Sequence, residues 1–448
     1  MGMSRREFVR TAALAGAGLL ATGPSWAQDL QGAPAKSGGS SANDLRIAII
    51  GAGSQGRFLM TQTLKIPGLR YVAVCDAWPY HQRYGANILK KYDQIVNVYD
   101  DYREMLSKEK DLDAVIVATP DWMHAEHANA CLNAGAHVYC EKEMSNTVEG
   151  ARSMVETARK TGKLLQIGHQ RRSSPRYWHS IKMIDKDKVL GRITHCYGQW
   201  NRAQLLEQGW PKGEEMADDA LKRFGYDNMD QFRNWRWYRR FSGGPLADLG
   251  SHQIDIFNWI LKATPTAVLG SGGLDYYTEQ TGRDWYDNAM TIYEYRTALG
   301  PVRAFYQVLN TTSYGGFYEQ FMGDQGTLQI SDDGKTGYVF REVTAKRREW
   351  EDEADKIEKL GRDAIELKIG ETLASDGKKD PEGQKLLAES MKDSRLLHLE
   401  NFFRTVRGED KLNCPAEVGY ETAVTVLKAN RAIDDGVRVT FESSEFTC

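Results

Sequence analysis

The sequence lacks paired cysteines, an excess of charge of either sign and any long apolar run. Its six cysteines show no CxxC pair and no spacing typical of a metal site: Cys75, Cys131, Cys140, Cys196, Cys414 and Cys448. This pattern favours free buried thiols over a disulfide framework. The net charge is only −3, and because phosphate neutralisation needs a concentrated basic surface, we expect no nucleic-acid partner.

The first 27 residues have the three parts of an export signal. Arg5, Arg6 and Arg10 form the positive region, “TAALAGAGLLATG” is the apolar stretch, and “SWAQ” supplies a small-x-Ala cleavage site after Ala27. The apolar stretch is too short and too rich in Gly and Ala to span a membrane, so we expect no membrane anchor. The segment resembles a twin-arginine signal, which implies that the twin-arginine export machinery carries the folded protein to the periplasm or another exported location. Residues 28–44 are expected to form a flexible linker.

From Leu45 onward, short apolar runs alternate with helical patterns. The runs are “LRIAII” (45–50), “YVAVCD” (71–76), “AVIVATP” (114–120), “HVYCEK” (137–142) and “LLQIGH” (164–169), and the clearest helical patterns cover 123–135 and 147–162. Such alternation predicts a parallel sheet with right-handed crossovers. We therefore expect an α/β protein of two or three domains, in which residues 45–168 form a doubly wound Rossmann domain.

The segment “GAGSQG” (51–56) has the spacing and the context of a dinucleotide-binding loop, because it follows a strand and opens a helix. Gly51 permits the tight turn, Gly53 lets the backbone approach the pyrophosphate, and Gly56 lets the helix meet the strand. The free N–H groups at the start of the helix, around Ser54 and Gln55, are expected to face the phosphates.

Asp76 ends the next strand, twenty residues after Gly56, and bears on the choice of cofactor. A carboxylate in this place accepts hydrogen bonds from the ribose hydroxyls of NAD and repels the 2′-phosphate of NADP. Arg83 lies nearby in the sequence and is long enough to reach a phosphate, so NADP stays open. NAD is the favoured cofactor.

After His169 the alternation stops, and longer strands with short turns follow. Helical patterns cover 174–186, 394–408 and 415–435, and strand patterns cover 192–200, 288–295, 301–309 and 327–331. We expect residues 169–448 to form a substrate-binding and oligomerisation domain of the α+β class with a large open, mostly antiparallel sheet. The highly charged residues 344–398 are expected to form a peripheral helical insert.

Three motifs occur in order along the chain: “ATPDWMHAEHANACLNAGAHVYCEKEMS” (118–145), “IGHQRR” (167–172) and “GGPLADLGSHQIDIFNWIL” (243–261). Together they resemble the Gfo/Idh/MocA oxidoreductases, a family named for glucose–fructose oxidoreductase and inositol dehydrogenase. The resemblance implies an NAD(P)-dependent enzyme, a homodimer or homotetramer, whose site contains the lysine of a Glu-Lys-Pro motif and an Asp-x-x-x-His pair. The matching residues are Lys142, Asp248 and His252.

The chemistry of these three residues agrees with the oxidation of a secondary hydroxyl. Lys142 follows a parallel strand at the edge where such sheets bind ligands, and its charge is expected to stabilise a developing alkoxide. His252 is expected to titrate in the range needed to accept the hydroxyl proton. Asp248 lies four residues before His252, on the same helical face, where it either orients the imidazole or holds a sugar hydroxyl.

Further residues are expected to complete the pocket around the cofactor. By the resemblance, Thr119, Pro120 and His124 line the nicotinamide ribose. We also expect cofactor contacts from Glu141, Lys142 and Gln170. His124 and His127 form no metal site in this interpretation, because a carboxylate and a third ligand are missing from the pattern.

On the substrate side the sequence leaves two alternatives. Arg171 and Arg172 begin the second domain, and they either reach the substrate or brace the domain junction. Candidates for stacking on the apolar face of a sugar ring are Trp285, Trp235, Trp237 and Tyr238, although aromatic residues more often belong to a core.

Two positions depart from the family pattern. Glu143 stands where the family usually has a proline whose peptide bond is often cis. Because a cis bond before a non-proline residue costs about 2.5–4 kcal/mol, we expect the Lys142–Glu143 peptide to be trans. His169 and Gln170 replace the more usual Phe–Asn pair.

An exported dehydrogenase has no soluble NAD pool with which to exchange, so we expect a tightly bound cofactor that is reoxidised in place. The favoured function is oxidation of a secondary hydroxyl of a sugar or glycoside. One alternative is a redox-neutral, NAD-dependent glycoside hydrolase that uses transient oxidation at C3 and elimination; such relatives commonly lack the lysine that Lys142 matches. A second alternative is a non-catalytic, NAD-dependent sugar sensor, against which the intact Lys142, Asp248 and His252 count.

We predict that the protein binds NADH more tightly than NADPH, because Asp76 accepts hydrogen bonds from the ribose and repels a 2′-phosphate. Fluorescence titration of cofactor-free protein with each dinucleotide measures the two dissociation constants. A smaller constant for NADPH would contradict the role given to Asp76.

Overall fold

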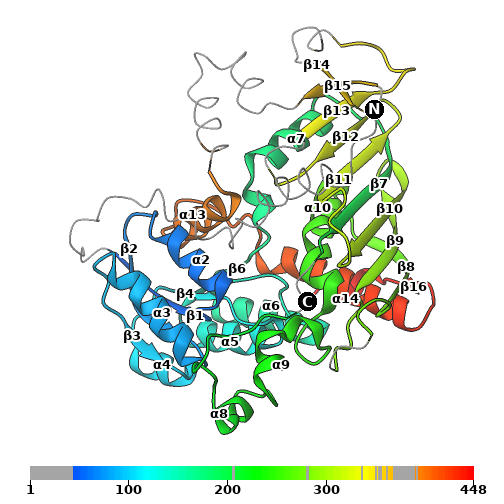
Figure 1. The fold of residues 1–448 in the computed structure, drawn as a ribbon. Helices are drawn as coiled ribbons and strands as arrows, with labels where there is room; N and C mark the ends of the chain where they lie inside the picture. The colour runs from blue at the N-terminus through cyan, green and yellow to red at the C-terminus, as the bar shows by residue number, and fades with distance from the viewer. Residues whose placement is uncertain are drawn as a thin grey trace, which may run out of the picture.

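The computed structural model describes residues 44–203, 207–278, 282–333, 337–348, 351, 356–359, 362–366, 389 and 392–448. The predicted export signal at 1–27 and the linker up to residue 43 lie outside these residues. The described chain folds around two β-sheets, one in each half of the sequence, with helices packed against both (Figure 1). Among the described helices, none is long and apolar enough to cross a membrane.

The N-terminal sheet is parallel, with the strand order β3-β2-β1-β4-β5-β6. Its strands are β1 (Leu45–Ile50), β2 (Leu69–Cys75), β3 (Asn97–Tyr99), β4 (Ala114–Val117), β5 (His137–Cys140) and β6 (Leu165–Ile167). Its helices are α2 (Ser54–Thr63), α3 (Pro79–Lys90), α4 (Tyr102–Lys108), α5 (Asp121–Asn133) and α6 (Val148–Thr161). This order is that of a doubly wound Rossmann domain and confirms the predicted fold class. The strand order reverses beside β1 and β4, where such sheets form their ligand crevice.

Helices from the end of the chain complete the core of the Rossmann domain. α13 (Ser394–Val406) packs against α2 and contributes Leu399, Phe402 and Phe403 to a buried cluster with residues of β1. α14 (Ala416–Asp434) contacts both α6 and a strand of the second sheet, β8 (Pro265–Gly273). The two halves of the chain therefore share buried apolar surface.

The C-terminal sheet has the order β14-β15-β13-β12-β11-β7-β10-β9-β8-β16. Its strands, besides β8, are β7 (Ile193–Asn201), β9 (Asn288–Thr297), β10 (Gly300–Leu309), β11 (Phe317–Gly323), β12 (Gly326–Ile330), β13 (Gly337–Arg341), β14 (Lys356–Lys359), β15 (Arg362–Glu366) and β16 (Val439–Thr440). Neighbours run antiparallel except β7 and β10, which confirms the predicted open, mostly antiparallel sheet. α7 (Pro175–Asp185) and α10 (Ser251–Leu261) belong to this half, and α10 lies so close to β7 that a Cβ at Gly198 would be 2.9 Å from Phe257.

The structure corrects the prediction for the charged insert at 344–398. Within the described part of that range, β14 and β15 pair with each other, and β15 pairs with β13 at the edge of the C-terminal sheet. Ala364 and Ile365 are buried there, so pairing with a sheet edge outweighs the helical preference of the charged residues around them. Residues 367–388 of the insert lie outside the described residues.

Two buried ion pairs brace the junction that follows β6. Arg171, in the turn η2 (Gln170–Ser173), pairs with Glu319 of β11, which also accepts a hydrogen bond of 2.8 Å from the Tyr177 hydroxyl. The Nε of Arg172 lies 2.9 Å from both carboxylate oxygens of Asp255 on α10. The predicted substrate role of Arg171 and Arg172 is therefore corrected: buried carboxylates take up both guanidiniums, and both side chains act as braces.

We predict that Arg171→Met lowers the free energy of unfolding by about 3–5 kcal/mol, because it leaves the Glu319 carboxylate buried without its partner. Denaturant unfolding followed by circular dichroism measures the change. The control is Arg431→Met, which removes one half of an exposed pair with Asp435 and is expected to cost no more than about 1 kcal/mol. Equal losses in the two variants would contradict the bracing role.

Candidate active site

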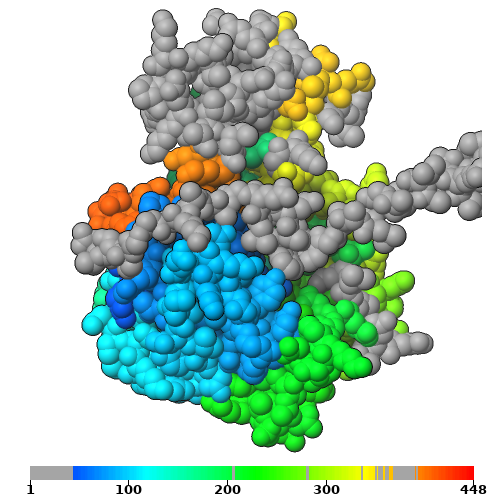
Figure 2. Space-filling model, turned by 60° about the vertical axis from the view of Figure 1, so that its left-hand side comes forward, coloured from blue at the N-terminus to red at the C-terminus, as the bar shows by residue number. Residues whose placement is uncertain are grey.

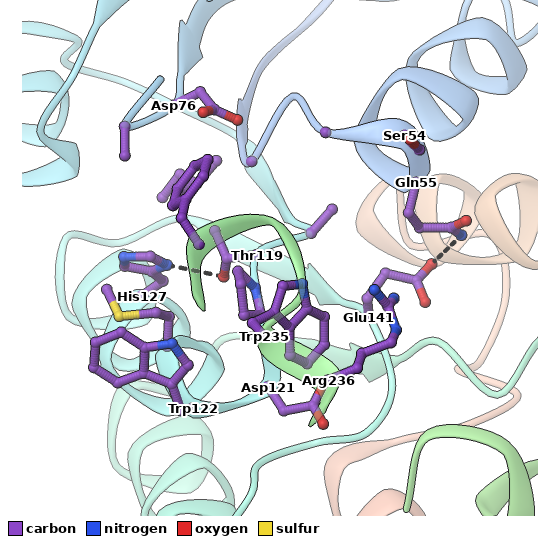
Figure 3. Close-up of a pocket in the computed structure, with 18 of the residues that line it drawn as sticks. Ser54, Gln55, Asp76, Thr119, Asp121, Trp122, His127, Glu141, Trp235 and Arg236 are labelled. Carbon is purple, nitrogen blue, oxygen red and sulfur yellow. Dashed lines mark hydrogen bonds between the residues drawn. The ribbon is translucent and has the colours of Figure 1, made fainter. Parts of the chain in front are cut away.

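A cavity of about 810 Å³ lies at the carboxyl ends of the parallel strands, between the Rossmann domain and the C-terminal half (Figure 3). Most of the predicted site residues line it: Gly51, Gly53, Ser54, Gln55, Asp76, Thr119, Pro120, Glu141, Lys142, Gln170, Asp248 and His252. The carboxyl end of a parallel sheet is where doubly wound folds bind their ligands. The cavity is therefore the candidate active site.

The glycine turn between β1 and α2 has the geometry that the motif requires. Gly51 has φ +95°, and a Cβ at this position would lie 2.5 Å from the Ala118 carbonyl oxygen. A Cβ at Gly56 would lie 1.9 Å from the Gly51 carbonyl oxygen. Only a glycine at position 56 therefore lets helix α2 pack this closely against the turn. Gly53 precedes α2, and no side chain caps the first N–H groups of this helix. The turn thus fits the pyrophosphate of a dinucleotide.

Asp76 is held as a carboxylate at the end of β2. Its Oδ2 accepts a hydrogen bond of 2.7 Å from the Ala52 N–H, and its Oδ1 accepts one of 2.9 Å from the Trp78 N–H. Burial raises the pKa of Asp76, but His81 and these N–H groups outweigh burial and hold the pKa below its ordinary value. Arg83, the residue that kept NADP open, pairs instead with Glu214.

Around the cofactor end of the cavity, polar side chains fix one another. The Gln55 amide donates to Glu141 Oε1 at 3.0 Å, and Thr119 Oγ1 lies 3.1 Å from His127 Nδ1 (Figure 3). His124 was predicted to line the nicotinamide ribose, but its side chain does not reach the cavity. Its two ring nitrogens lie 2.7 Å from the carbonyl oxygens of Thr119 and Glu143, so the ring supports the loop from behind.

Lys142, Asp248 and His252 converge as predicted, although they come from different elements. Lys142 follows β5, Asp248 lies in the π-helical turn η4 (Leu246–Gly250), and His252 lies in the first turn of α10. The Lys142 ammonium donates to the backbone carbonyl oxygen of Asp248 and lies 3.4 Å from its Oδ1. The Arg236 Nε lies 3.3 Å from the same Oδ1. Burial raises the pKa of Asp248, but Arg236, Lys142 and Arg202 outweigh it and hold the pKa below its usual range.

The sequence left two roles open for Asp248, orienting the imidazole of His252 or holding a sugar hydroxyl, and the structure bears on the first. The Oδ1 of Asp248 faces the cations of Lys142 and Arg236, and no hydrogen bond joins this carboxylate to the imidazole of His252 in the described chain. Asp248 therefore positions the lysine, and the imidazole is oriented by something else.

His252 differs from its prediction in one respect. Burial, followed by the charges of Lys142 and Arg171, lowers the pKa of its imidazole well below the ordinary value. The ring is therefore neutral in the physiological pH range. This differs from the prediction, in which His252 titrates near neutral pH. Its plane lies against Trp200, with the ring centroids 5.5 Å apart.

The peptide bond between Lys142 and Glu143 is cis, so the prediction of a trans bond was wrong. That prediction rested on the local cost of the cis form alone. It left out tertiary contacts: Glu143 is fully buried, and its carbonyl oxygen lies 2.7 Å from His124 Nδ1.

Trp285 does not reach the cavity. Its indole N–H donates to the Ser242 carbonyl oxygen at 3.0 Å, and the Arg239 guanidinium covers the ring at 4.2 Å, so Trp285 belongs to the core. Trp237 and Tyr238 are also buried, whereas Trp235 lines the cavity. The lining residues that the sequence did not point to include Asp121, Trp122, Trp200 and Arg236. The sequence could have indicated one of these residues, Trp200, because it is an aromatic residue at the end of a predicted strand.

Residues 207–241, here called the cover segment, form the second wall of the cavity. They include α8 (Asp218–Arg223), α9 (Met229–Arg233) and η3 (Trp235–Trp237). The Trp78 indole donates to the Glu214 carbonyl oxygen at 2.6 Å, and the Trp122 indole donates to the Tyr226 hydroxyl at 3.1 Å. Figure 2 shows this part of the C-terminal half, in green, packed against the Rossmann domain.

Among the described residues, no group of three or more His, Cys, Asp or Glu side chains is arranged to hold a metal ion. The polar groups of the cavity include amides, hydroxyls, a lysine, guanidiniums, and imidazoles and carboxylates that are not grouped around one point. The glycine turn and Asp76 fit NAD: Gly51 and Gly56 leave no room for side chains, and the Asp76 carboxylate lines the same cavity, where it would bond the ribose hydroxyls.

Comparison with known proteins gives matches over both halves. The NAD-binding Rossmann-fold model of the Gfo/Idh/MocA oxidoreductase family matches residues 45–169. The C-terminal alpha/beta domain model of the same family matches residues 216–441. Together these ranges cover well over half of the chain.

Individual relatives are more distant. D-glucoside 3-dehydrogenase of Escherichia coli (strain K12) is 31% identical over 225 residues, which make up 49% of this chain and 55% of that protein. The chain thus spans about half the length of that relative. scyllo-Inositol 2-dehydrogenase (NAD(+)) of Bacillus subtilis (strain 168) is 26% identical over 64% of this chain and 74% of that protein. A levoglucosan dehydrogenase solved with NADH and L-sorbose shares the fold, with a TM-score of 0.67, 17% identity and coverage of 90% of this chain and 100% of that one.

We predict that the acid limb of kcat/KM lies below the ordinary histidine pKa of about 6.5, because the lowered pKa of His252 keeps its ring neutral and able to accept a proton. A pH profile of kcat/KM measures the limb. Burial raises the pKa of Asp121 to about 6, so the profile is repeated in Asp121→Asn to remove the titration of this carboxyl. A limb near 6.5 in both proteins would contradict the neutral His252.

Proposed function

Because the chain belongs to the Gfo/Idh/MocA oxidoreductase family, we propose that it is an exported NAD-dependent enzyme that oxidises a secondary hydroxyl of a sugar or glycoside. The observation that carries this proposal is the convergence of Lys142, Asp248 and His252 on the cavity that also contains the glycine turn and Asp76. The dinucleotide-binding turn and a proton acceptor line the same cavity. Oxidation of an alcohol requires this, because a hydride and a proton are removed from the same substrate.

Each residue has a distinct task in this reaction. Bound NAD supplies the hydride acceptor. The Lys142 ammonium, held by Asp248, stabilises negative charge on the substrate oxygen and so lowers the pKa of the hydroxyl. The neutral imidazole of His252 accepts the hydroxyl proton at Nε2, the ring nitrogen that is not shut inside the fold. The charge of Lys142 also disfavours the imidazolium, so after the transfer His252 releases the proton from Nε2 to water in the cavity.

The substrate class is supported by the relatives and by the cavity wall. The two relatives and the structural neighbour are named for a glucoside, an inositol and levoglucosan. Trp200 packs beside His252, and Trp235 lies in the cavity under the Arg236 guanidinium, at 4.2 Å. The Trp200 ring is itself stacked on Phe317, with the ring centroids 4.5 Å apart, so the proposed sugar contacts are Trp235, whose ring can pack on the apolar face of a sugar, and Arg236, whose N–H groups can bond its hydroxyls.

A tightly bound cofactor is part of the proposal, and it is reoxidised in place by passing its hydride to the carbonyl group of a second sugar. Export rests on the resemblance of residues 1–27 to a twin-arginine signal, and outside the cytoplasm no NAD pool replaces a lost molecule. Nanomolar affinity, about −12 kcal/mol, would keep the cofactor bound at high dilution. The cover segment supports retention, because its hydrogen bonds with Trp78 and Trp122 hold a wall of the cavity against the Rossmann domain. Association as a homodimer or homotetramer is proposed from the family resemblance, and light scattering that gave a monomer mass would contradict it.

The test of the proposed function uses purified full-length protein. We predict that it carries NAD that is released on denaturation, and that mixing it with a panel of aldoses and glycosides reduces this cofactor in a single turnover. Mass spectrometry identifies the nicotinamide and the sugar product. Cleavage of a glycoside without net reduction would favour the hydrolase, and sugar binding with neither reaction would favour the sensor.

We predict that Lys142→Met lowers kcat by about a hundredfold or more, because the substrate oxygen loses its stabilising cation. Lys160→Met, which removes an exposed lysine of α6, is the matched control and is expected to keep wild-type kcat. The measurement is turnover of the sugar identified above, with cofactor content checked in each variant. A Lys142→Met enzyme that keeps a tenth of wild-type turnover would remove the lysine from this role.

A further inference from the structure

A second buried imidazole, that of His169, lies next to His252 and has no role in the proposed reaction so far. His169 precedes η2 and is 1% exposed, and its ring centroid lies 6.4 Å from that of His252, with the two rings nearly perpendicular at 86°. Neither ring nitrogen of His169 has a hydrogen-bond partner in the described part of the chain, and the same holds for Nδ1 of His252. Three polar nitrogens on two neighbouring rings therefore lie inside the fold without hydrogen-bond partners in the described chain.

Two neighbouring groups that could bond these nitrogens are already engaged, Asp255 and His398. The Asp255 carboxylate accepts from Arg172 at 2.9 Å and from the Thr422 hydroxyl at 3.1 Å. His398, which also lies close to His169, has its ring nitrogens 2.7 Å from Ser173 Oγ and 2.9 Å from the Ile167 carbonyl oxygen. Since a buried polar atom without a hydrogen-bond partner destabilises the folded chain, a group that bonds both imidazoles would be held here.

Acid–base chemistry at His252 depends on which nitrogen carries the hydrogen. A neutral imidazole has one N–H, and Nε2 accepts a proton only when this hydrogen is on Nδ1. A buried Nδ1–H needs an acceptor, and Asp248 does not serve, because it faces Lys142 and Arg236. Burial lowers the pKa of His169 to about 4, so its ring is neutral and offers a lone pair as well as an N–H.

We propose that His169 is a positioning residue that holds His252 in its Nδ1–H tautomer through one buried water bonded to both rings. The centroid separation of 6.4 Å between perpendicular rings suits one water bridging two nitrogens better than a direct bond. This inference rests on the proposed function, in which His252 accepts the substrate proton. It assigns the orientation of the imidazole to His169, which the sequence analysis treated only as a departure from the family pattern.

The first test needs no substrate and no variant in the site. A high-resolution crystal structure of the full chain with NAD is expected to show an ordered water about 3 Å from His252 Nδ1 and from a ring nitrogen of His169. NMR of protein labelled with ¹⁵N-histidine is expected to show His252 as a single Nδ1–H tautomer. A His252 signal from the Nε2–H form, or density without a bridging water, would overturn the proposal.

The second test compares substitutions of His169. His169→Phe keeps the ring volume but removes both nitrogens, and it is expected to give a mixture of His252 tautomers and to lower kcat by about tenfold to a hundredfold, with KM and NAD content unchanged. His169→Gln, which restores a polar group, is expected to recover part of the loss. The control is His195→Phe on β7, where the ring is exposed, and both readouts are expected to stay at wild-type values.

The outcomes separate this inference from the proposed function. If His252→Gln and Lys142→Met keep full activity, the proposed function fails whatever the tautomer of His252. If those two variants lose activity while His169→Phe keeps the wild-type tautomer and kcat, only the role of His169 fails.

Discussion

The bond between the Lys142 ammonium and the backbone of Asp248 joins the two halves of the molecule at the place where the chemistry is proposed to occur. Lys142 comes directly after a strand of the Rossmann sheet, and Asp248 lies in a π-helical turn of the C-terminal half, so the two residues meet only when both halves are folded. A π-turn is a common feature of functional sites. Here it places the Asp248 carbonyl and carboxylate toward the lysine and leaves the imidazole of His252 beside the cavity.

The need to pair buried charges explains the ion pairs around the contact between Lys142 and Asp248. A charged group is tolerated inside a protein only with a partner, and the junction satisfies this with Arg171–Glu319 and Arg172–Asp255. Burial lowers the pKa of the His252 imidazole, and the charges of Lys142 and of the brace residue Arg171 lower it further. One structural brace thus adds to the effect of burial on the proposed base.

The site could be predicted from the sequence wherever a motif is local. Gly51 and Gly56 were assigned their tasks correctly, because a turn between a strand and a helix dictates a close backbone approach. Arg171 and Trp285 could not be placed, because a buried partner such as Glu319 or the Ser242 carbonyl is far away in the sequence. The wall made by the cover segment was not predicted, since its indole contacts link residues more than a hundred positions apart.

The sequence by itself determined the Rossmann domain, the open sheet and the glycine turn, because periodicity and short spacings report on contacts close along the chain. The resemblance of three ordered motifs to the family pointed to Lys142, Asp248 and His252. Only the tertiary structure decided which carboxylate faces which cation, that His252 is neutral, and that His169 lies behind it. These properties arise from burial and from charges brought together across the fold, and no local pattern of residues carries that information.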